Sequence, residues 1–250
     1  MNDHYMLKKI AVIRSDFPTK FGIPRQSGVV DTLEARIVFD PEYRNPDALR
    51  GMEEYSHIWL IWQFSEAVRD TWSPTVRPPK LGGNVRKGVF ATRSPFRPNA
   101  LGLSCVQLKR VIPDSPEGPV LVVTGADLMD GTPIYDIKPY IPYADAHPDA
   151  RESFTADTSK ISLSVEDPTG FLTLVPEEKR ESLIGVLSQD PRPGYQKDPD
   201  RVYGFPFAGF EVKFRVKDET VILCGLEREL PEESCVNKGE CIVYEDRNRN

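Results

Sequence analysis

The stretch most suited to chemistry is residues 81–104, LGGNVRKGVFATRSPFRPNALGLS, which combines a stiff backbone with positive charge. Pro95 and Pro98 each fix one backbone angle and restrict the residue before them, so the loop is stiff although it has no repeating pattern. From Thr71 to Ile112 there is no Asp or Glu, but eight Lys or Arg side chains. A stiff basic loop at the end of a strand can position a phosphate or another anionic ligand. Taken alone, its Arg-Pro-Asn tripeptide favours a surface turn, whereas the length of the acid-free run favours a functional site.

The residues around this loop predict a strand-rich domain. Short apolar runs separated by turn residues predict strands at 8–15, 34–39, 57–64, 88–93, 103–111, 120–125 and 134–142. The run 57–64, HIWLIWQF, predicts a central strand buried on both faces, with His57 as a structural histidine. Residues 47–54 predict a short helical turn capped by Asp47. Many short strands and few helices favour a closed or nearly closed β-barrel over a doubly wound sheet. The predicted fold class is mainly β.

The composition changes after the last of these strands. Residues 145–167 hold few large apolar side chains and predict a linker. Beyond it, 176–187 has the spacing of an amphipathic helix, and the runs 210–216 and 220–226 predict a β-hairpin. The predicted organisation is a barrel domain over 1–147, a linker over 148–170, a small α+β domain over 171–235 and a charged tail over 236–250.

The totals limit the classes of function. At a net charge of −6 the chain is no general polyanion binder, so contact with nucleic acid requires a local basic patch. Four cysteines without C-x-x-C spacing and three histidines predict no metal site. The longest apolar run, Ile58–Trp62, is too short to cross a bilayer, and the polar first ten residues are no signal peptide, which predicts a cytoplasmic protein. No P-loop or Rossmann glycine motif is present.

Several separate motifs, in one order, closely resemble the TrmO family. They are PRQSG at 24–28, LRGMEEYSHIWL at 49–60, VRPPKLGG at 76–83, GVFATRSPFRPN at 88–99, DLMDGTP at 127–133 and DIKPY at 136–140. The likeness covers about residues 8–147, and DPRPGY at 190–195 resembles a phrase of the C-terminal domain of bacterial members. Two positions depart from the pattern: Ser65 stands where members often have histidine, and Ala100-Leu101 replaces Pro-Ile.

The resemblance implies an S-adenosylmethionine-dependent tRNA methyltransferase. Members of the family methylate N6 of the threonylcarbamoyl-adenosine just 3′ of the anticodon, and the implied fold is a β-barrel that dimerises and binds its cofactor near the subunit interface. The implied partners are the tRNA anticodon arm and a second copy of the chain, with no membrane and no metal. A non-catalytic RNA- or nucleotide-binding barrel stays open as an alternative, because the family histidine is replaced by Ser65.

Resemblance and residue chemistry together predict the site. Methyl transfer from a sulfonium is an in-line displacement, so the protein has mainly to align the reactants and exclude water. The expected cofactor-binding residues are Arg25, Gln26, Ser27, Phe64, Ser65, Arg93, Leu103, Asp127, Leu128, Met129, Asp130, Gly131 and Thr132. Within this set, 127–132 offers carboxylate acceptors beside apolar side chains, although by itself it favours a turn between strands. Arg93 is expected to bind a carboxylate of the cofactor or of the substrate's threonyl group.

The remaining predicted residues concern the RNA. Asn99 and Tyr195 are expected to act in catalysis by orienting the acceptor nitrogen, and the group that takes its proton is left open. The residues expected to contact anticodon-arm phosphates are Lys80, Arg86, Lys87, Arg97 and Arg192. The exposed ring of Phe96 is expected to stack on a splayed base.

Overall fold

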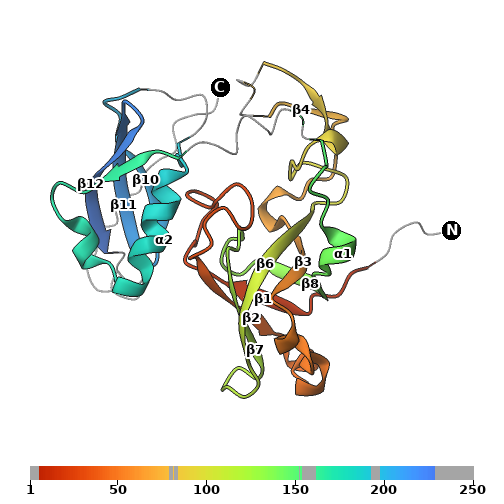
Figure 1. Ribbon diagram of the computed structural model, residues 1–250. Coiled ribbons are helices and arrows are strands. Elements are labelled where there is room, and N and C mark those ends of the chain that lie inside the picture. Colours follow the sequence, from red (N-terminus) through yellow and green to blue (C-terminus); the bar gives the residue numbers. More distant parts are fainter. Residues whose placement is uncertain are drawn as a thin grey trace, which may run out of the picture.

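The chain folds into a β-barrel and a second, smaller sheet (Figure 1). The computed structural model describes residues 6–78, 81, 84–151, 153, 162–192 and 198–228. Two separate clusters of buried apolar side chains form, one inside the barrel and one beneath the second sheet. In the described part of the chain no helix is long and apolar enough to cross a membrane.

The barrel closes in the order β1-β2-β7-β6-β3-β8. Its strands are β1 (Ala11–Arg14), β2 (Glu34–Phe39), β3 (His57–Gln63), β6 (Leu101–Ile112), β7 (Val120–Thr124) and β8 (Pro133–Pro139). All neighbouring pairs are antiparallel, and the pairing of Ala11 with Ile134 closes the ring. Inward-pointing residues such as Val106 and Leu108 fill the interior of the barrel, so it is packed with side chains and is not an open channel. The predicted mainly β class is confirmed.

Strand β3 shows how closure of the barrel determines which side chains are buried. Ile58, Leu60 and Trp62 are buried inside, whereas Trp59 and Ile61 are only half-buried on the outer face. The prediction of a strand buried on both faces was therefore wrong, because a barrel wall has an inner and an outer side. His57 is exposed, and its Nδ1 lies 2.9 Å from the hydroxyl of Ser56.

Residues 64–100 are here called the β3–β6 excursion, and their described part forms short elements. These are η4 (Ser65–Ala67), β4 (Thr75–Val76), β5 (Lys87–Gly88) and η6 (Val89–Ala91). The strand predicted over 88–93 is wrong beyond Gly88. The hydroxyl and the N–H of Thr92 both donate to the carbonyl of Val89, at 2.9 and 3.2 Å, and hold that backbone in a turn. β4 and β5 pair with each other and extend away from the barrel (Figure 1).

The connection between β2 and β3 forms three short turns instead of one helix. They are η1 (Pro41–Tyr43), η2 (Pro46–Leu49) and η3 (Met52–Glu54). Asn45 caps η2 by accepting a hydrogen bond from the N–H of Asp47 at 3.0 Å, so the predicted cap at Asp47 is wrong. Gly51 separates η2 from η3 with a φ of +84°, a conformation that favours glycine.

The described part of the second unit is a four-stranded sheet with one α-helix. Its order is β10-β11-β12-β9, in which β9 is parallel to β12. After α1 (Pro142–Asp145), which follows the barrel, the elements are β9 (Ser164–Glu166), η8 (Phe171–Leu174), α2 (Glu177–Ser188), β10 (Tyr203–Phe207), β11 (Phe210–Lys217) and β12 (Thr220–Arg228). The sheet thus begins at Ser164, inside the segment predicted as linker. The predicted tail, 236–250, lies outside the described residues.

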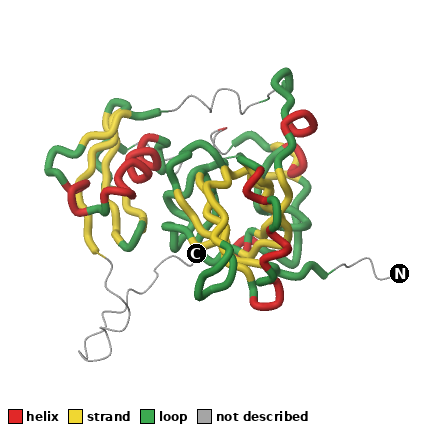
Figure 2. Tube along the Cα trace, turned by 60° about the horizontal axis from the view of Figure 1, so that its bottom comes forward, coloured by secondary structure: helices red, strands yellow, loops and turns green. Residues whose placement is uncertain are grey.

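The two units are joined by residues 15–33, here called the β1–β2 connection. Its apolar side chains Phe17, Val30 and Leu33 are buried in the core of the second unit, where Phe17 meets Phe207 edge to face with ring centroids 5.3 Å apart. Figures 1 and 2 show α2 on the side of its sheet that faces the barrel. A loop of the barrel therefore completes the core of the second unit.

Candidate functional site

A half-buried carboxylate lies at one mouth of the barrel. Asp127 follows β7 closely, and its Oδ1 accepts a hydrogen bond of 2.6 Å from the hydroxyl of Ser104 on β6. The Ser104 oxygen in turn accepts a hydrogen bond of 3.0 Å from the indole N–H of Trp62. A Cβ on Gly102 would lie 2.3 Å from the Trp62 ring, so only glycine lets this ring lie across β6. The Trp62–Ser104–Asp127 chain of hydrogen bonds thus fixes the carboxylate.

The surroundings of Asp127 change its acidity. Burial raises the pKa of Asp127 above its ordinary value, and this is the largest effect. The hydrogen bond from Ser104, the positive charge of Arg93 and the backbone N–H of Ser27 act in the opposite direction. Asp127 is therefore a partly desolvated acceptor, close to a guanidinium and to the backbone of a second loop.

The second loop is 24–28, which belongs to the β1–β2 connection. The N–H of Gly28 donates to the carbonyl of Gly125 at 2.8 Å, and a Cβ on Gly125 would lie 3.2 Å from Cα of Gly28. This close approach places the loop against the end of β7. The guanidinium of Arg93 donates a hydrogen bond to the side-chain oxygen of Gln26. Four residues predicted to bind cofactor, Gln26, Ser27, Arg93 and Asp127, are therefore brought together; Arg25 is exposed beside them.

The end of β3 reaches the same mouth. The ring of Phe64 packs against Trp62 with a centroid distance of 4.2 Å, and its N–H donates to the carbonyl of Ala100 at 2.8 Å. Ser65 opens an exposed turn directly after it. Phe64 thus offers an apolar surface next to the Trp62–Ser104–Asp127 chain.

A groove of about 450 Å³ lies on the outer side of β6. It is lined by Phe90, Arg97, Pro98, Asn99, Leu101 and Leu103. Asn99, predicted to orient the acceptor, is on its wall. Leu103 and Ser104 are neighbours on a strand, so their side chains point to opposite faces; Leu103 is 57% exposed outside and Ser104 is buried inside. Leu103 and Asp127 are therefore not brought together within one chain.

The rest of the predicted 127–132 segment serves the fold. The side chain of Leu128 fills the barrel core with 1% exposure, so it is not available as a ligand wall. Asp130 accepts hydrogen bonds from the N–H of Ser15 at 3.0 Å and from Arg14 at 3.3 Å. The turn is closed by the hydroxyl of Thr132, which donates to the carbonyl of Met129 at 2.7 Å. The N–H of Gly131, in the same turn, donates to the carbonyl of Ile13 at 2.9 Å. For Met129, Asp130, Gly131 and Thr132 a binding role stays a prediction.

Two groups of cations occur in the acid-free stretch: Lys109 and Arg110 on β6, and Arg86, Lys87 and Arg97 in the β3–β6 excursion. Lys109 and Arg110 lie 2.6 and 3.5 Å from the carboxylate of Glu34, whose pKa the hydrogen bond from Lys109 lowers. Their charge is therefore compensated. In the β3–β6 excursion, the guanidinium of Arg86 donates to the Thr75 hydroxyl at 3.0 Å. Arg97 donates to a backbone carbonyl of the same excursion at 3.2 Å, and Lys87 lies on β5.

Arg192 has a different environment from that predicted. It forms two parallel hydrogen bonds of 2.7 and 2.9 Å to the carboxylate of Asp190, and both side chains are largely buried. This pairing raises the pKa of Arg192 further. The guanidinium is committed to its own loop, so we leave it out of the RNA surface proposed below. Lys80 and Tyr195 lie outside the described residues.

Exposed aromatic rings accompany the cations of the excursion. Trp72 and Phe90 are 52% and 73% exposed, with ring centroids 6.1 Å apart. Phe96 is 42% exposed, and the guanidinium of Arg69 lies 3.8 Å from its ring centre. Exposed rings among cations are typical of surfaces that stack single-stranded bases.

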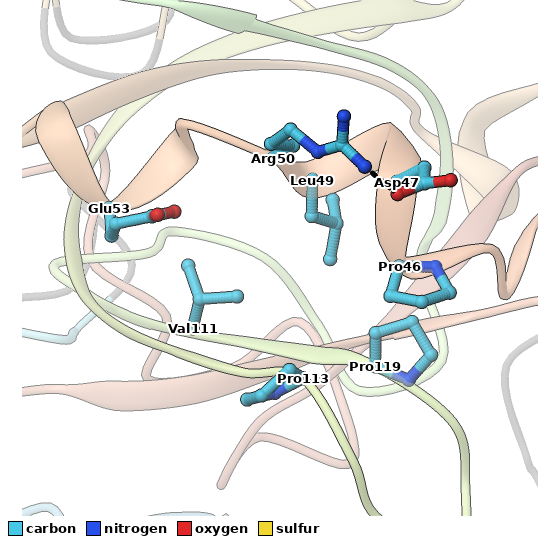
Figure 3. Close-up of a pocket in the computed structure, with 8 residues that line it drawn as sticks. All are labelled: Pro46, Asp47, Leu49, Arg50, Glu53, Val111, Pro113 and Pro119. Atoms are coloured by element: carbon cyan, nitrogen blue, oxygen red, sulfur yellow. Dashed lines mark hydrogen bonds and ion pairs between the residues drawn. The ribbon is translucent and has the colours of Figure 1, made fainter.

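A second cavity, of about 330 Å³, lies at the other end of the barrel (Figure 3). Leu49, Val111 and three prolines form its apolar wall. Of its three charged residues, Asp47 and Arg50 are paired with each other and Glu53 is the third. Ser104 and Val111 lie on one strand, and seven residues of strand span about 23 Å. This cavity is therefore separate from the site around Asp127.

Sequence reasoning missed Trp62, Gly102 and Ser104. Each has a recognisable type: a tryptophan and a serine with hydrogen-bonding side chains, and a glycine inside a strand, which often marks close approach of another group. The register of β3 against β6, in which Trp62 pairs with Gly102, brings these three residues together.

The fold and the site define a class: a closed-barrel protein with a half-buried carboxylate at one mouth and an exposed surface of cations and aromatic rings beside it. The chain belongs to the tRNA-methyltransferase O family. The N-terminal domain of that family matches residues 12–146 and its C-terminal domain matches residues 173–229.

Similar proteins cover nearly the whole chain. The tRNA (adenine(37)-N6)-methyltransferase of Escherichia coli is 40% identical over 238 residues, which cover 89% of this chain and 98% of that protein. A Pseudomonas aeruginosa protein, provisionally named as an S-adenosylmethionine-dependent methyltransferase, is 41% identical over 80% of this chain and 87% of its own length. A crystal structure of TrmO from P. aeruginosa has a TM-score of 0.73 at 32% identity and covers 91% of this chain and 99% of that one.

Proposed function

We propose that this protein transfers a methyl group from S-adenosylmethionine to N6 of the threonylcarbamoyl-adenosine 3′ of the anticodon, acting on cytoplasmic tRNA. Family membership and the name of the E. coli relative support the reaction class. The observation that carries the site is the meeting of Gln26, Ser27 and Arg93 around Asp127. These residues come from three separate segments of the chain. A turn within one segment would not need the other two nearby, so their meeting supports a binding site.

The residues present fit this cofactor. The carboxylate of Asp127 can accept hydrogen bonds from amino or hydroxyl groups, and the guanidinium of Arg93 can pair with a carboxylate. The ring of Phe64 supplies an apolar surface at the same mouth. When bound, S-adenosylmethionine supplies a methyl group on a sulfonium, which is a strong electrophile.

The protein's own part in the reaction is alignment. Asn99 lies on the wall of the groove, where its amide can hold the acceptor nitrogen by a hydrogen bond. The residues that line this groove in the described part of the chain include no carboxylate and no imidazole. Orientation by Asn99 and exclusion of water by Phe90 and Leu103 are therefore the contributions we assign to the groove.

The β3–β6 excursion is the surface that we propose for the anticodon arm. Arg86, Lys87 and Arg97 supply positive charge next to the exposed rings of Trp72 and Phe90. Phosphate contacts by such cations release counterions, so binding should weaken steeply as salt rises. Stacking on the rings suits an anticodon loop, whose bases can be unstacked and turned outward.

We also propose that a second copy of the chain packs on the outer face of β3 and β6. Ile61 pairs in register with Leu103, so both apolar side chains face outward. Trp59, two residues earlier on β3, donates its indole N–H to Asp145 of α1 at 3.0 Å. A dimer over this face would cover the exposed Leu103 and bring it to a cofactor site. Light scattering after size-exclusion chromatography tests this: we expect a dimer for the wild type and a monomer for Leu103→Glu, and a monomeric wild type would contradict it.

Nucleoside mass spectrometry tests the proposed reaction. Purified protein, S-adenosylmethionine and tRNA carrying threonylcarbamoyl-adenosine should yield the N6-methylated nucleoside. tRNA from cells that lack the protein should lose this nucleoside. Absence of product, with S-adenosylhomocysteine binding intact in calorimetry, would favour the alternative of a non-catalytic binding barrel. Absence of both would remove the cofactor assignment.

A further inference from the structure

We propose that helix α2 of the second unit positions the loop that supplies Gln26 and Ser27, and thereby sets the affinity for the methyl donor. The inference rests on the proposed function, since it concerns the same cofactor site. It assigns to Gly185, Lys179 and Ser182 a positioning role for a cofactor site whose candidate contacts, within the described residues, lie in the barrel unit. The second unit then helps to hold the cofactor-binding loop in position.

The tightest contact joins α2 to Val30. Gly185 faces Val30 so closely that a Cβ on the glycine would lie 2.6 Å from Cγ1 of Val30, a distance that real Cβ atoms essentially never show. Val30 is 5% exposed, packed in the core of the second unit and only three residues after Ser27. The absence of a side chain at Gly185 therefore sets how near this loop can lie to α2.

Two polar contacts fix the same loop from the same helix. The ammonium of Lys179 lies 2.6 Å from the carboxylate of Asp16, with both side chains largely buried. The hydroxyl of Ser182, which is 1% exposed, donates to the carbonyl of Thr32 at 2.8 Å. Together with Gly185 they contact the loop on successive turns of the helix, which determines its orientation as well as its distance.

The opposite side of the loop is held by the barrel. The backbone of Gly28 bonds to Gly125 at 2.8 Å, and the N–H of Gly125 bonds to the carbonyl of Leu33 at 2.9 Å. Asp127 follows two residues after Gly125. Residues 28–33 thus lie between α2 and the strand end that carries Asp127. Because these contacts are closely packed, a side-chain atom added on α2 must displace residues 28–33. That displacement moves the segment that places Ser27 near the carboxylate of Asp127.

Gly185→Ala tests the inference. The added methyl group must displace Val30, and with it the loop. Overpacking of this kind destabilises the loop's binding position by about as much free energy as one weak binding contact contributes. We therefore expect the Kd for S-adenosylhomocysteine to rise about tenfold. The KM for S-adenosylmethionine should rise in parallel, while kcat at saturating donor stays within about twofold. Alanine favours helix more than glycine does, so the helix itself is not weakened.

A compensating variant and a matched control make the test specific. Val30→Ala removes the methyl group that Gly185→Ala would strike, so the double variant should recover wild-type affinity to within about threefold. Gly225→Ala is the control: its Cβ would meet Lys213 at an ordinary 3.5 Å, on β12 and away from the loop. It should leave the Kd unchanged.

The outcomes separate this inference from the proposed function. If Gly185→Ala binds S-adenosylhomocysteine as the wild type does, or if the double variant shows no recovery, the positioning role is wrong. Equal weakening by Gly225→Ala would also overturn it, since the effect would then reflect general destabilisation. If Gly185→Ala does not fold, Lys179→Gln takes its place, with the same expected rise in KM at constant kcat. Failure of the wild type to bind the ligand would instead remove the proposed function.

Discussion

Replacement of Asp127 by asparagine should separate stability from binding. The asparagine oxygen can still accept the hydrogen bond from Ser104, so the Trp62–Ser104 arrangement is kept and only the charge is lost. Burial raises the pKa of Asp127, which means that the folded protein pays a desolvation cost for the charged form. Removal of this charge should therefore not lower the free energy of unfolding at neutral pH, and should raise it.

The pH dependence has a definite sign. For a carboxyl group whose pKa is raised on folding, the cost is fully present above the folded pKa and disappears as pH falls toward the ordinary value of 3.8. Each unit of such a shift corresponds to about 1.4 kcal/mol. The stability advantage of Asp127→Asn should thus be largest near pH 8 and shrink toward pH 4, as measured by urea unfolding of both proteins.

Binding should change in the opposite direction. Hydrogen bonds to a charged acceptor contribute about 1.5–3 kcal/mol, so S-adenosylhomocysteine should bind Asp127→Asn about 10- to 100-fold more weakly. Asp136→Asn, which alters a half-exposed carboxylate paired with Lys138 on the outer face, is the control and should bind normally. A variant at Asp127 that is less stable at pH 8 and binds the ligand like the wild type would refute the reasoning.

Three further outcomes are expected. Gly102→Ala places a Cβ 2.3 Å from the Trp62 ring and should lower the free energy of unfolding by about 1–3 kcal/mol in urea titrations; unchanged stability would show that the ring can move aside. Arg93→Ala should keep the circular dichroism spectrum and lose methyl transfer, and full activity would remove Arg93 from the site. Trp72→Ala should weaken binding of an anticodon stem-loop, measured by fluorescence anisotropy, by about 1–3 kcal/mol if a base stacks there. Equal weakening for double-stranded RNA would argue against stacking.

The barrel could be predicted because the chain has many short apolar runs separated by turn residues and few helical stretches. Both ends of the strand at 34–39 were predicted correctly, since apolar side chains recur at every second position. The run 88–93 was misassigned because the side chain of Thr92 bonds back to Val89, a local contact that an apolar pattern does not reveal. β9 was missed because a three-residue strand gives almost no periodic signal.

The candidate site could be predicted only in part. Gln26, Ser27, Arg93 and Asp127 were found through family motifs, and their convergence agrees with the proposed site. The Trp62–Ser104–Asp127 chain depends on the register of β3 and β6, which neither strand shows alone. Arg192 was assigned to RNA, but the structure pairs it with Asp190, which adopts a φ of +51° that sequence alone does not indicate.

The most direct test of the account is a crystal structure of the protein with S-adenosylhomocysteine. The account predicts the ligand at the mouth of the barrel, with its polar groups within hydrogen-bond distance of Asp127 and of Gln26 or Arg93. Ligand bound instead in the cavity between Leu49 and Val111 at the other end of the barrel, with the surroundings of Asp127 unchanged, would contradict it.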